Sequence, residues 1–144
     1  MNNDLNRFNE AQHRDYVTAL SEIKSARKVT HWMWYIFPQI AGLGLSDTSK
    51  YYAINSIAEA RLFLNHEYLG YNLKEISFEL LNLKTDDAYS VFGSPDHLKL
   101  KSSMTLFSYV EGNEYNVFKR VLEKFFNGTY DNKTIEILNK LTEP

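Results

Sequence analysis

Apolar residues recur at steps of three and four along most of the chain, the spacing that one face of an α-helix produces. Runs that alternate apolar and polar residues, as a half-buried strand does, extend over only a few positions. The helical stripes are Tyr16, Ala19, Leu20 and Ile23; Leu69, Leu73, Ile76, Leu80 and Leu83; Leu100, Met104, Phe107 and Val110; Tyr115, Phe118, Val121, Leu122, Phe125 and Phe126; and Ile135, Leu138 and Leu141. The pattern predicts an all-α protein.

Residues typical of helix ends stand between these stripes. Ser56 with Glu59 fits a capping box, and Asn127-Gly128 is a typical C-terminal stop. Asp15, Asp131 and Ser94 ahead of Pro95 are expected to cap helices, and residues 85–87 to start a short helix that ends near Gly93. Phe8 and Ala11 indicate a short preceding turn or a longer first helix. We expect a compact single domain over residues 1–144, a bundle of about seven to nine short helices.

The segment from Val29 to Phe37 is harder to assign. It is rich in β-branched and aromatic residues, which favour a buried strand. No second segment stands out as a partner for such a strand, however. Thr30 could cap a helix that Pro38 ends, and we therefore expect a short buried helix here.

The chain has 144 residues and a mass of 16.8 kDa, and 15% of its residues are aromatic, with 10 tyrosines. Most of these rings must pack in the core, because each buries on the order of 150–250 Å². A buried tyrosine also needs a partner for its hydroxyl. Either polar contacts run through the core, or several tyrosines line a wet cleft.

Charge and cysteine content exclude several functional classes. The net charge is −2 and the basic residues are scattered, so we expect no nucleic-acid or membrane partner. There is no cysteine, and the four histidines show no metal-ligand spacing, so neither a metal nor another cofactor is expected. The polar start lacks a signal peptide, which favours a cytoplasmic location. The oligomeric state stays open.

His31 is the first candidate for chemistry, because imidazole transfers protons near neutral pH. It stands among Trp32, Trp34 and Tyr35, whose rings could stack on a planar ligand. The alternative is a core histidine bonded to a backbone carbonyl.

Gln39 and the glycine-rich segment that follows it form the second candidate. Gly42 and Gly44 allow the backbone to approach a ligand closely, and Ser46 stands before a probable helix. Amides exposed in such a loop can hold an anion, although neither a phosphate-binding loop nor a dinucleotide motif is present. A tight turn with Ser46 as an ordinary cap is the alternative.

A polar helix face provides the third candidate. Asp96, Lys99 and Ser103 share one face of the helix whose opposite side carries Leu100 and Met104. Lys99 and Asp96 either pair with each other or point into a cleft shared with His31 and Gln39.

Several of these segments also carry a resemblance that spans essentially the whole chain. The block His31–Gln39 resembles a family of uncharacterised small bacterial proteins sometimes labelled "calpastatin". The other segments that carry the resemblance are Gly42-Leu43-Gly44 with Ser46 and residues 11–12, 19–20, 52–54, 92–96, 99–100 and 102–107. The resemblance implies a compact all-helical domain and no established reaction. A fainter likeness in size and helicity, to small helical glycosidases that act on ADP-ribose derivatives, is one of fold class only.

Two functions remain open. The first is a site for a nucleotide or nucleotide-sugar-like molecule, with hydrolysis or transfer at that bond as its chemistry. His31 and Asp96 would be the catalytic residues. The ligand would be bound by Trp32, Trp34, Gln39, Gly42, Gly44, Ser46, Lys99 and Ser103. The second is a protein-interaction module with an exposed aromatic surface and no catalytic activity.

Overall fold

The computed structural model describes residues 5–142, and this part of the chain forms nine α-helices and no strand. The helices are α1 (Asn6–Lys24), α2 (Met33–Ile36), α3 (Asp47–Tyr51), α4 (Ile57–Asn65), α5 (Leu69–Asn82), α6 (Ala88–Phe92), α7 (Asp96–Glu111), α8 (Val117–Phe126) and α9 (Asn132–Thr142). The all-helical prediction is confirmed.

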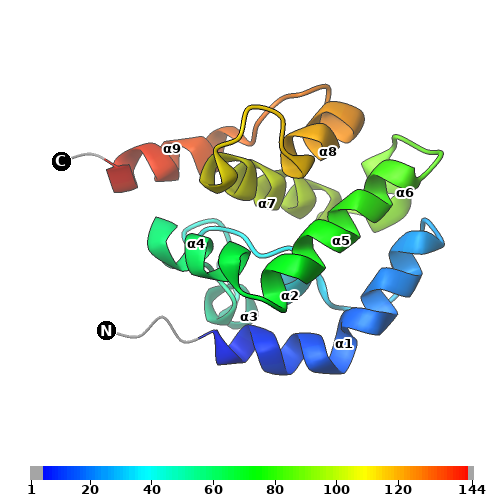
Figure 1. The fold of residues 1–144 in the computed structure, drawn as a ribbon, viewed down its shortest axis with the longest axis horizontal. Helices are drawn as coiled ribbons and strands as arrows, with labels where there is room; N and C mark the ends of the chain where they lie inside the picture. Colours follow the sequence, from blue (N-terminus) through cyan, green and yellow to red (C-terminus); the bar gives the residue numbers. More distant parts are fainter. Residues whose placement is uncertain (1–4, 143–144) are drawn as a thin grey trace.

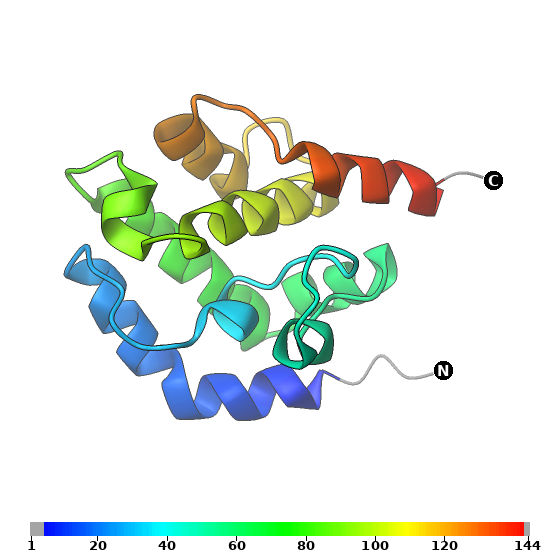
Figure 2. The same ribbon diagram turned by 180° about the vertical axis from the view of Figure 1, so that it is seen from behind.

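Helix α5 runs through the middle of the molecule, as the green ribbon in Figure 1 shows. It packs against α1 on one side and against α4 and α8 on others. Helices α7, α8 and α9 lie together across α5 from α1, which is also visible from behind in Figure 2. The short helices α2 and α3 occupy the long connection between α1 and α4, and this connection carries the candidate site.

Side-chain caps explain where several helices begin and end. The side chains of Ser46, Ser56 and Asn116 each accept a hydrogen bond from the backbone N–H three residues later, which satisfies one of the free donors of a first helical turn. Asp131 does the same for Thr134 at the start of α9. At the end of α8, Asn127 adopts a left-handed conformation. Ser56, Asp131 and Asn127 were predicted from the sequence, Ser46 was named as a cap in the alternative interpretation of its segment, and Asn116 was not predicted.

Three predicted helix starts were wrong. Helix α1 is continuous from Asn6, so Asp15 lies inside it and binds the Tyr35 hydroxyl instead of a helix end. Helix α2 has Trp32 at its N-cap, because the backbone N–H and hydroxyl of Thr30 are bound by the Glu22 carboxylate. Helix α7 begins one residue later than Ser94-Pro95 predicts, with Pro95 at the N-cap.

Aromatic side chains form much of the core. Four rings contact one another in a row, with neighbouring ring centroids 5.1–5.9 Å apart: Phe8, Phe63, Phe107 and Phe118. Trp32 is 1% exposed, which confirms that at least one of the two tryptophans is largely buried.

The partly buried tyrosine hydroxyls find hydrogen-bond partners inside the protein. Tyr16 donates to the Asn72 carbonyl and to Glu75, and burial together with Glu75 raises the pKa of Tyr16. Burial and the hydrogen bond to Asp15 raise the pKa of Tyr35 to about 12. Both hydroxyls therefore stay protonated at neutral pH, and polar contacts do run through this core.

Within residues 5–142, no helix has the length and apolar character needed to cross a membrane.

Candidate functional site

The connection from α2 to α4 leaves the core near Ile40 and returns to it at Ile54, and these two residues lie side by side. The Ala41 N–H donates to the Ile54 carbonyl and the Ile54 N–H donates to the Gln39 carbonyl, each at 2.8 Å. These two bonds form an isolated parallel bridge between Ile40 and Ile54. The bridge closes residues 41–53 into a loop that contains α3, and sequence periodicity did not predict it.

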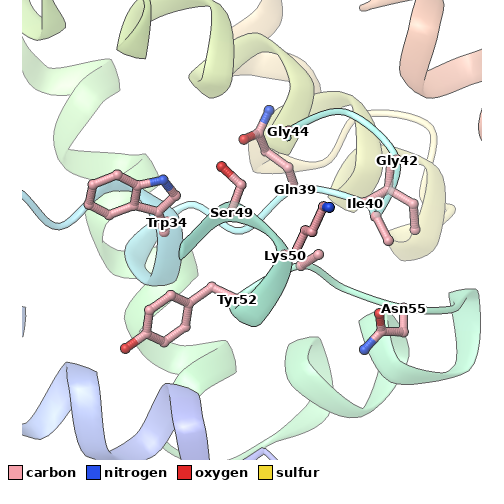
Figure 3. Close-up of a pocket in the computed structure, with 11 residues that line it drawn as sticks. Trp34, Gln39, Ile40, Gly42, Gly44, Ser49, Lys50, Tyr52 and Asn55 are labelled. Atoms are coloured by element: carbon pink, nitrogen blue, oxygen red, sulfur yellow. The ribbon is translucent and has the colours of Figure 1, made fainter. Parts of the chain in front are cut away.

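This loop and α2 enclose a cavity of about 160 Å³, which we call the α2–α3 cavity (Figure 3). Four residues predicted to bind a ligand line it: Trp34, Gln39, Gly42 and Gly44. The other lining residues are Ile40, Ala41, Ser49, Lys50, Tyr52, Ala53 and Asn55.

The two glycines of the loop are required for different physical reasons. Gly42 has a φ of +107°, a backbone conformation that side chains with a Cβ rarely adopt. Gly44 has no positive φ, but a Cβ at this position would lie 2.4 Å from the Cβ of Ser49. The loop therefore passes so close to α3 that any larger residue would displace one of them.

Arg7 of α1 anchors the returning arm of the loop. Its guanidinium donates to the backbone carbonyls of Tyr51 and Ala53 at 2.8 and 2.9 Å. It also forms a 3.0 Å ion pair with Glu59 of α4, whose side chain is 4% exposed. Glu59 in turn accepts the backbone N–H of Asn55. The cavity wall is thus tied to α1 and α4 by buried charged groups.

Four polar groups at the cavity have no protein partner in the described part of the chain. The side chains of Gln39, Lys50 and Asn55 make no hydrogen bond or ion pair there, and the buried Nε1 of Trp34 is likewise unpaired. Figure 3 shows the Lys50 side chain running from α3 toward the segment that carries Gln39 and Ile40. The cavity therefore offers one cation, two amides and an indole N–H to a ligand.

A cluster of lysines and tryptophans lies beside this cavity. Asp96 binds Lys28 at 2.9 Å and Lys99 at 3.4 Å, so the predicted pair of Asp96 with Lys99 is present and is extended by a second cation. Each lysine also lies over an indole: Lys28 Nζ is 5.0 Å from the Trp32 ring centroid, and Lys99 Nζ is 5.0 Å from that of Trp34. Two positive charges share one carboxylate, and the cluster is net positive.

Glu22 holds the chain that leads into this cluster. Its carboxylate accepts hydrogen bonds from the Val29 and Thr30 N–H groups, the Thr30 hydroxyl and the Trp32 indole. Desolvation raises the pKa of Glu22, but these hydrogen bonds outweigh it and lower the pKa to about 2. Trp32 is therefore a buried residue of the core whose polar atom is already bound, which corrects its assignment as a ligand-stacking side chain.

Six of the residues predicted to form the site do not line the α2–α3 cavity. His31 is exposed, Trp32 is buried, and Asp96 is bound by Lys28 and Lys99. Lys99 reaches the cavity only indirectly, through its contact with the Trp34 ring. The other two have structural positions: Ser46 caps α3, and Ser103 is fully buried with an unpaired hydroxyl. His31, Gln39, Asp96 and Lys99 were predicted to surround one pocket, and of these four only Gln39 lines the α2–α3 cavity.

Sequence reasoning missed Ser49, Lys50 and Asn55. No motif marks them, and their only signal is position, because they follow the glycine-rich segment within a dozen residues. The bridge at Ile54 is what brings them back to Gln39.

The model of a protein family described as "Protein of unknown function (DUF1810)" matches residues 2–138. The chain belongs to this family. Membership agrees with the resemblance found in the sequence, which also implied no established reaction. The label "calpastatin" is not part of the description of this family.

A crystal structure of the conserved hypothetical protein Rv1873 from Mycobacterium tuberculosis is closely similar to this DUF1810 protein. The two share 39% sequence identity over 94% of this chain and 96% of that one, with a TM-score of 0.90. No curated protein matches the chain. The family and the fold are therefore established, and neither carries a known activity.

Proposed function

We propose that this DUF1810 protein binds a nucleotide-like small molecule and that one ring of the ligand enters the α2–α3 cavity. The observation that carries the proposal is the set of unpaired polar groups at the cavity: Trp34 Nε1, Gln39, Lys50 and Asn55. Of these groups only Trp34 Nε1 is buried away from water, while Gln39 is partly buried and Lys50 and Asn55 are exposed. A donor that is buried without a hydrogen bond costs about 1–3 kcal/mol, which a ligand can recover.

The size of the cavity limits what can enter it. Its volume of about 160 Å³ is close to that of an engineered cavity of about 150 Å³ that binds benzene. Drug-sized ligands occupy sites of roughly 300–1,000 Å³. The cavity therefore accommodates a single base or sugar ring, and the rest of a nucleotide would lie at its mouth.

The chemistry of the lining suits such a ligand. Gln39 and Asn55 each offer a donor and an acceptor, which match the edge of a base or the hydroxyls of a sugar. The indole N–H of Trp34 can only donate, so it requires an acceptor such as a carbonyl oxygen. Lys50 is the cationic residue of the lining and would bind a phosphate or carboxylate.

The proposal is one of binding and includes no reaction. None of the residues that line the cavity carries a carboxylate or an imidazole. Asp96 is engaged by two lysines, and His31 lies outside the lining. Acid–base catalysis of hydrolysis needs such a group within reach of the bond that breaks.

The direct test is to titrate the protein with AMP, ADP-ribose and adenosine and to measure binding by calorimetry. Thermal unfolding with and without each ligand is the second measurement. We expect AMP or ADP-ribose to raise the melting temperature, because a ligand that binds only the folded state stabilises it. Lys50→Met should weaken the binding of AMP and ADP-ribose about tenfold or more. It should change the binding of adenosine little, since adenosine lacks the charge that Lys50 would bind.

Lys84→Met is the matched control, because Lys84 is exposed and lies outside the cavity lining. It should bind every ligand as the wild type does. If no nucleotide or nucleoside binds at millimolar concentration, or if Lys50→Met binds AMP as tightly as the wild type, the proposal is overturned.

A protein-interaction surface remains the second candidate, and one group of exposed rings favours it. Tyr71 and Phe78 of α5 and Tyr115 ahead of α8 are 64%, 47% and 63% exposed, and the Arg120 guanidinium lies over both Phe78 and Tyr115. Phe78→Ser should abolish association with a partner and leave nucleotide binding intact. Intact association in this variant would argue against the second candidate.

A further inference from the structure

A second and larger cavity lies where α7 ends and shares no lining residue with the proposed nucleotide site. Its volume is about 360 Å³, within the range of roughly 300–1,000 Å³ that small-molecule sites occupy. The end of α7, the start of α8 and the segment that leads into α9 contribute to its wall, and we call it the α7–α9 cavity. The lining residues that matter here are Ser108, Tyr109, Asn113, Glu114, Lys119 and Tyr130.

The charged groups of this lining are of opposite sign and unpaired. Glu114 comes from the connection between α7 and α8, and Lys119 from α8. Neither side chain forms a hydrogen bond or ion pair with any residue that the structure describes, whereas Asp96 and Lys99 elsewhere on the molecule are paired. A ligand with one positive and one negative group could engage both at once.

Two tyrosine rings complete the lining. Tyr109 is 44% exposed and Tyr130 is 39% exposed, and neither hydroxyl has a partner among the described residues. Rings of this kind stack on planar side chains and attract cations over their faces. Gly112 ends α7 at the same cavity, so the negative end of the α7 dipole adds to the attraction that Glu114 exerts on a cation.

We propose that the α7–α9 cavity binds a small zwitterion of the amino-acid class with a planar side chain. The ammonium group of the ligand binds Glu114 and the ligand carboxylate binds Lys119. The planar side chain packs against Tyr109 and Tyr130. This site is independent of the nucleotide site, because the two cavities share no lining residue.

The probes are L-phenylalanine and L-tryptophan, titrated into ¹⁵N-labelled full-length protein and followed by NMR. We expect amide shifts at Tyr109, Gly112 and Tyr130, with none at Gly42 or Lys50. L-Phenylalaninamide lacks the carboxylate and N-acetyl-L-phenylalanine lacks the ammonium group. Each should bind about tenfold or more weakly than L-phenylalanine, because a charge-assisted contact is lost.

Variants assign the contacts to residues. Glu114→Gln and Lys119→Met should each weaken L-phenylalanine by about tenfold or more. Their matched controls are Glu136→Gln and Lys133→Met, which alter exposed residues of α9 outside the lining and should leave binding unchanged. Tyr109→Phe should retain binding because the ring is kept, whereas Tyr109→Ala should weaken it.

Three outcomes would overturn the zwitterion site. One is that neither amino acid shifts any amide at millimolar concentration. Another is that the shifts fall on the α2–α3 cavity instead. The last is that the neutralised analogues bind as tightly as L-phenylalanine. Shifts at the α2–α3 cavity would show only that this cavity admits a planar ring. Nucleotide binding itself is measured with other ligands and other variants.

Discussion

Glu22 shows how one carboxylate organises a segment that has no regular structure of its own. Its four hydrogen bonds hold residues 29–32 between α1 and α2, and they lower its pKa to about 2 from the usual 4.5. The lower pKa means that the folded state prefers the ionised group. The stabilisation is therefore complete above pH 4.5 and is lost as the pH falls toward 2.

We expect Glu22→Gln to lower the free energy of unfolding at pH 7 by about 1.5–3 kcal/mol, because the hydrogen bonds lose their charge. The difference from the wild type should shrink between pH 4.5 and pH 2, as the wild type itself becomes protonated. Denaturant unfolding at a series of pH values measures this. Glu10→Gln, on an exposed position of α1, should change stability by no more than about 0.5 kcal/mol. A difference that stays constant with pH would contradict the prediction.

Gly44 limits the site in a different way, through space alone. An added Cβ would lie 2.4 Å from the Cβ and 2.6 Å from the hydroxyl of Ser49. Gly44→Ala should therefore destabilise the fold by about 1–3 kcal/mol, the usual range for overpacking.

A double variant tests this explanation. Ser49→Gly removes both atoms that the new Cβ would meet, so Gly44→Ala should be less harmful in that background than in the wild type. Unfolding free energies of the four proteins give the coupling between the two positions. Additive effects would show that the contact is not the reason that residue 44 is a glycine.

At the scale of single residues, the sequence indicates which side chains are available and not which of them meet. Gly42 and Gly44 were identified because loop glycines have few common roles. Lys50 was not, because a lysine on a short helix has the same pattern whether it faces solvent or a cavity. His31 and Trp32 are adjacent in sequence, yet one is exposed and the other is 1% exposed. Tertiary contacts such as that of Trp32 with Glu22 decide between them.

Among the elements, α5 has an unusual C-terminal cap supplied by another helix. Lys124 of α8 donates from Nζ to the carbonyl oxygens of Leu80 and Leu81 at 3.0 Å each, and also to that of Leu83. The last carbonyls of a helix have no partner within it, and a cation there also opposes the negative end of the helix dipole.

Lys124→Met keeps much of the aliphatic chain and removes all three hydrogen bonds. We expect the free energy of unfolding to fall by about 1.5–3 kcal/mol, because carbonyls at the α5–α8 contact lose a charged donor. Lys133→Met, on an exposed position of α9, is the matched control and should be nearly neutral. Equal melting temperatures for the two variants would show that water replaces the cap without loss.

The sequence pattern predicted where most of the helices lie. It predicted where a helix begins or ends only when the capping residue is close to that end in the sequence. Ser56 and Asn127 act on backbone groups a few residues away, so a sequence pattern reveals them. Thr30 also had the expected chemistry for a cap, but Glu22 of α1 binds its hydroxyl and N–H. The cap from Lys124 to α5 joins residues more than forty positions apart, and no periodicity encodes it.

At the scale of the whole molecule, the candidate site lies on the long connection between α1 and α4. Its shape depends on contacts with residues that are distant in the sequence. The all-α class followed from apolar stripes that each helix carries by itself. The α2–α3 cavity instead depends on a bridge at Ile40 and Ile54 and on Arg7, which lies near the start of the described chain. Fold class was therefore predictable from local pattern, while the shape of the site was not.

This dependence predicts a hierarchy of stability. Arg7→Met should lower the free energy of unfolding by about 3–5 kcal/mol, because it leaves the buried carboxylate of Glu59 without its cation. Beyond this global loss, the loop closed by the Ile40–Ile54 bridge should open more readily than the helical core. Hydrogen exchange followed by NMR can separate the two effects, because the Ala41 and Ile54 amides report on the bridge.

In Arg7→Met, we expect the exchange rates of these two amides to rise by more than the loss in global unfolding free energy predicts. The exchange rates of the α5 amides should rise only by the amount that this global loss predicts. The control is Arg61→Met, since Arg61 is an exposed residue of α4 that makes no hydrogen bond or ion pair with the described residues. Exchange of Ala41 and Ile54 that follows global stability in both variants would mean that the loop is part of the same cooperative unit as the core. In that case the cavity would open only when the whole protein unfolds, and a ligand would have to enter through a mouth already present in the folded state.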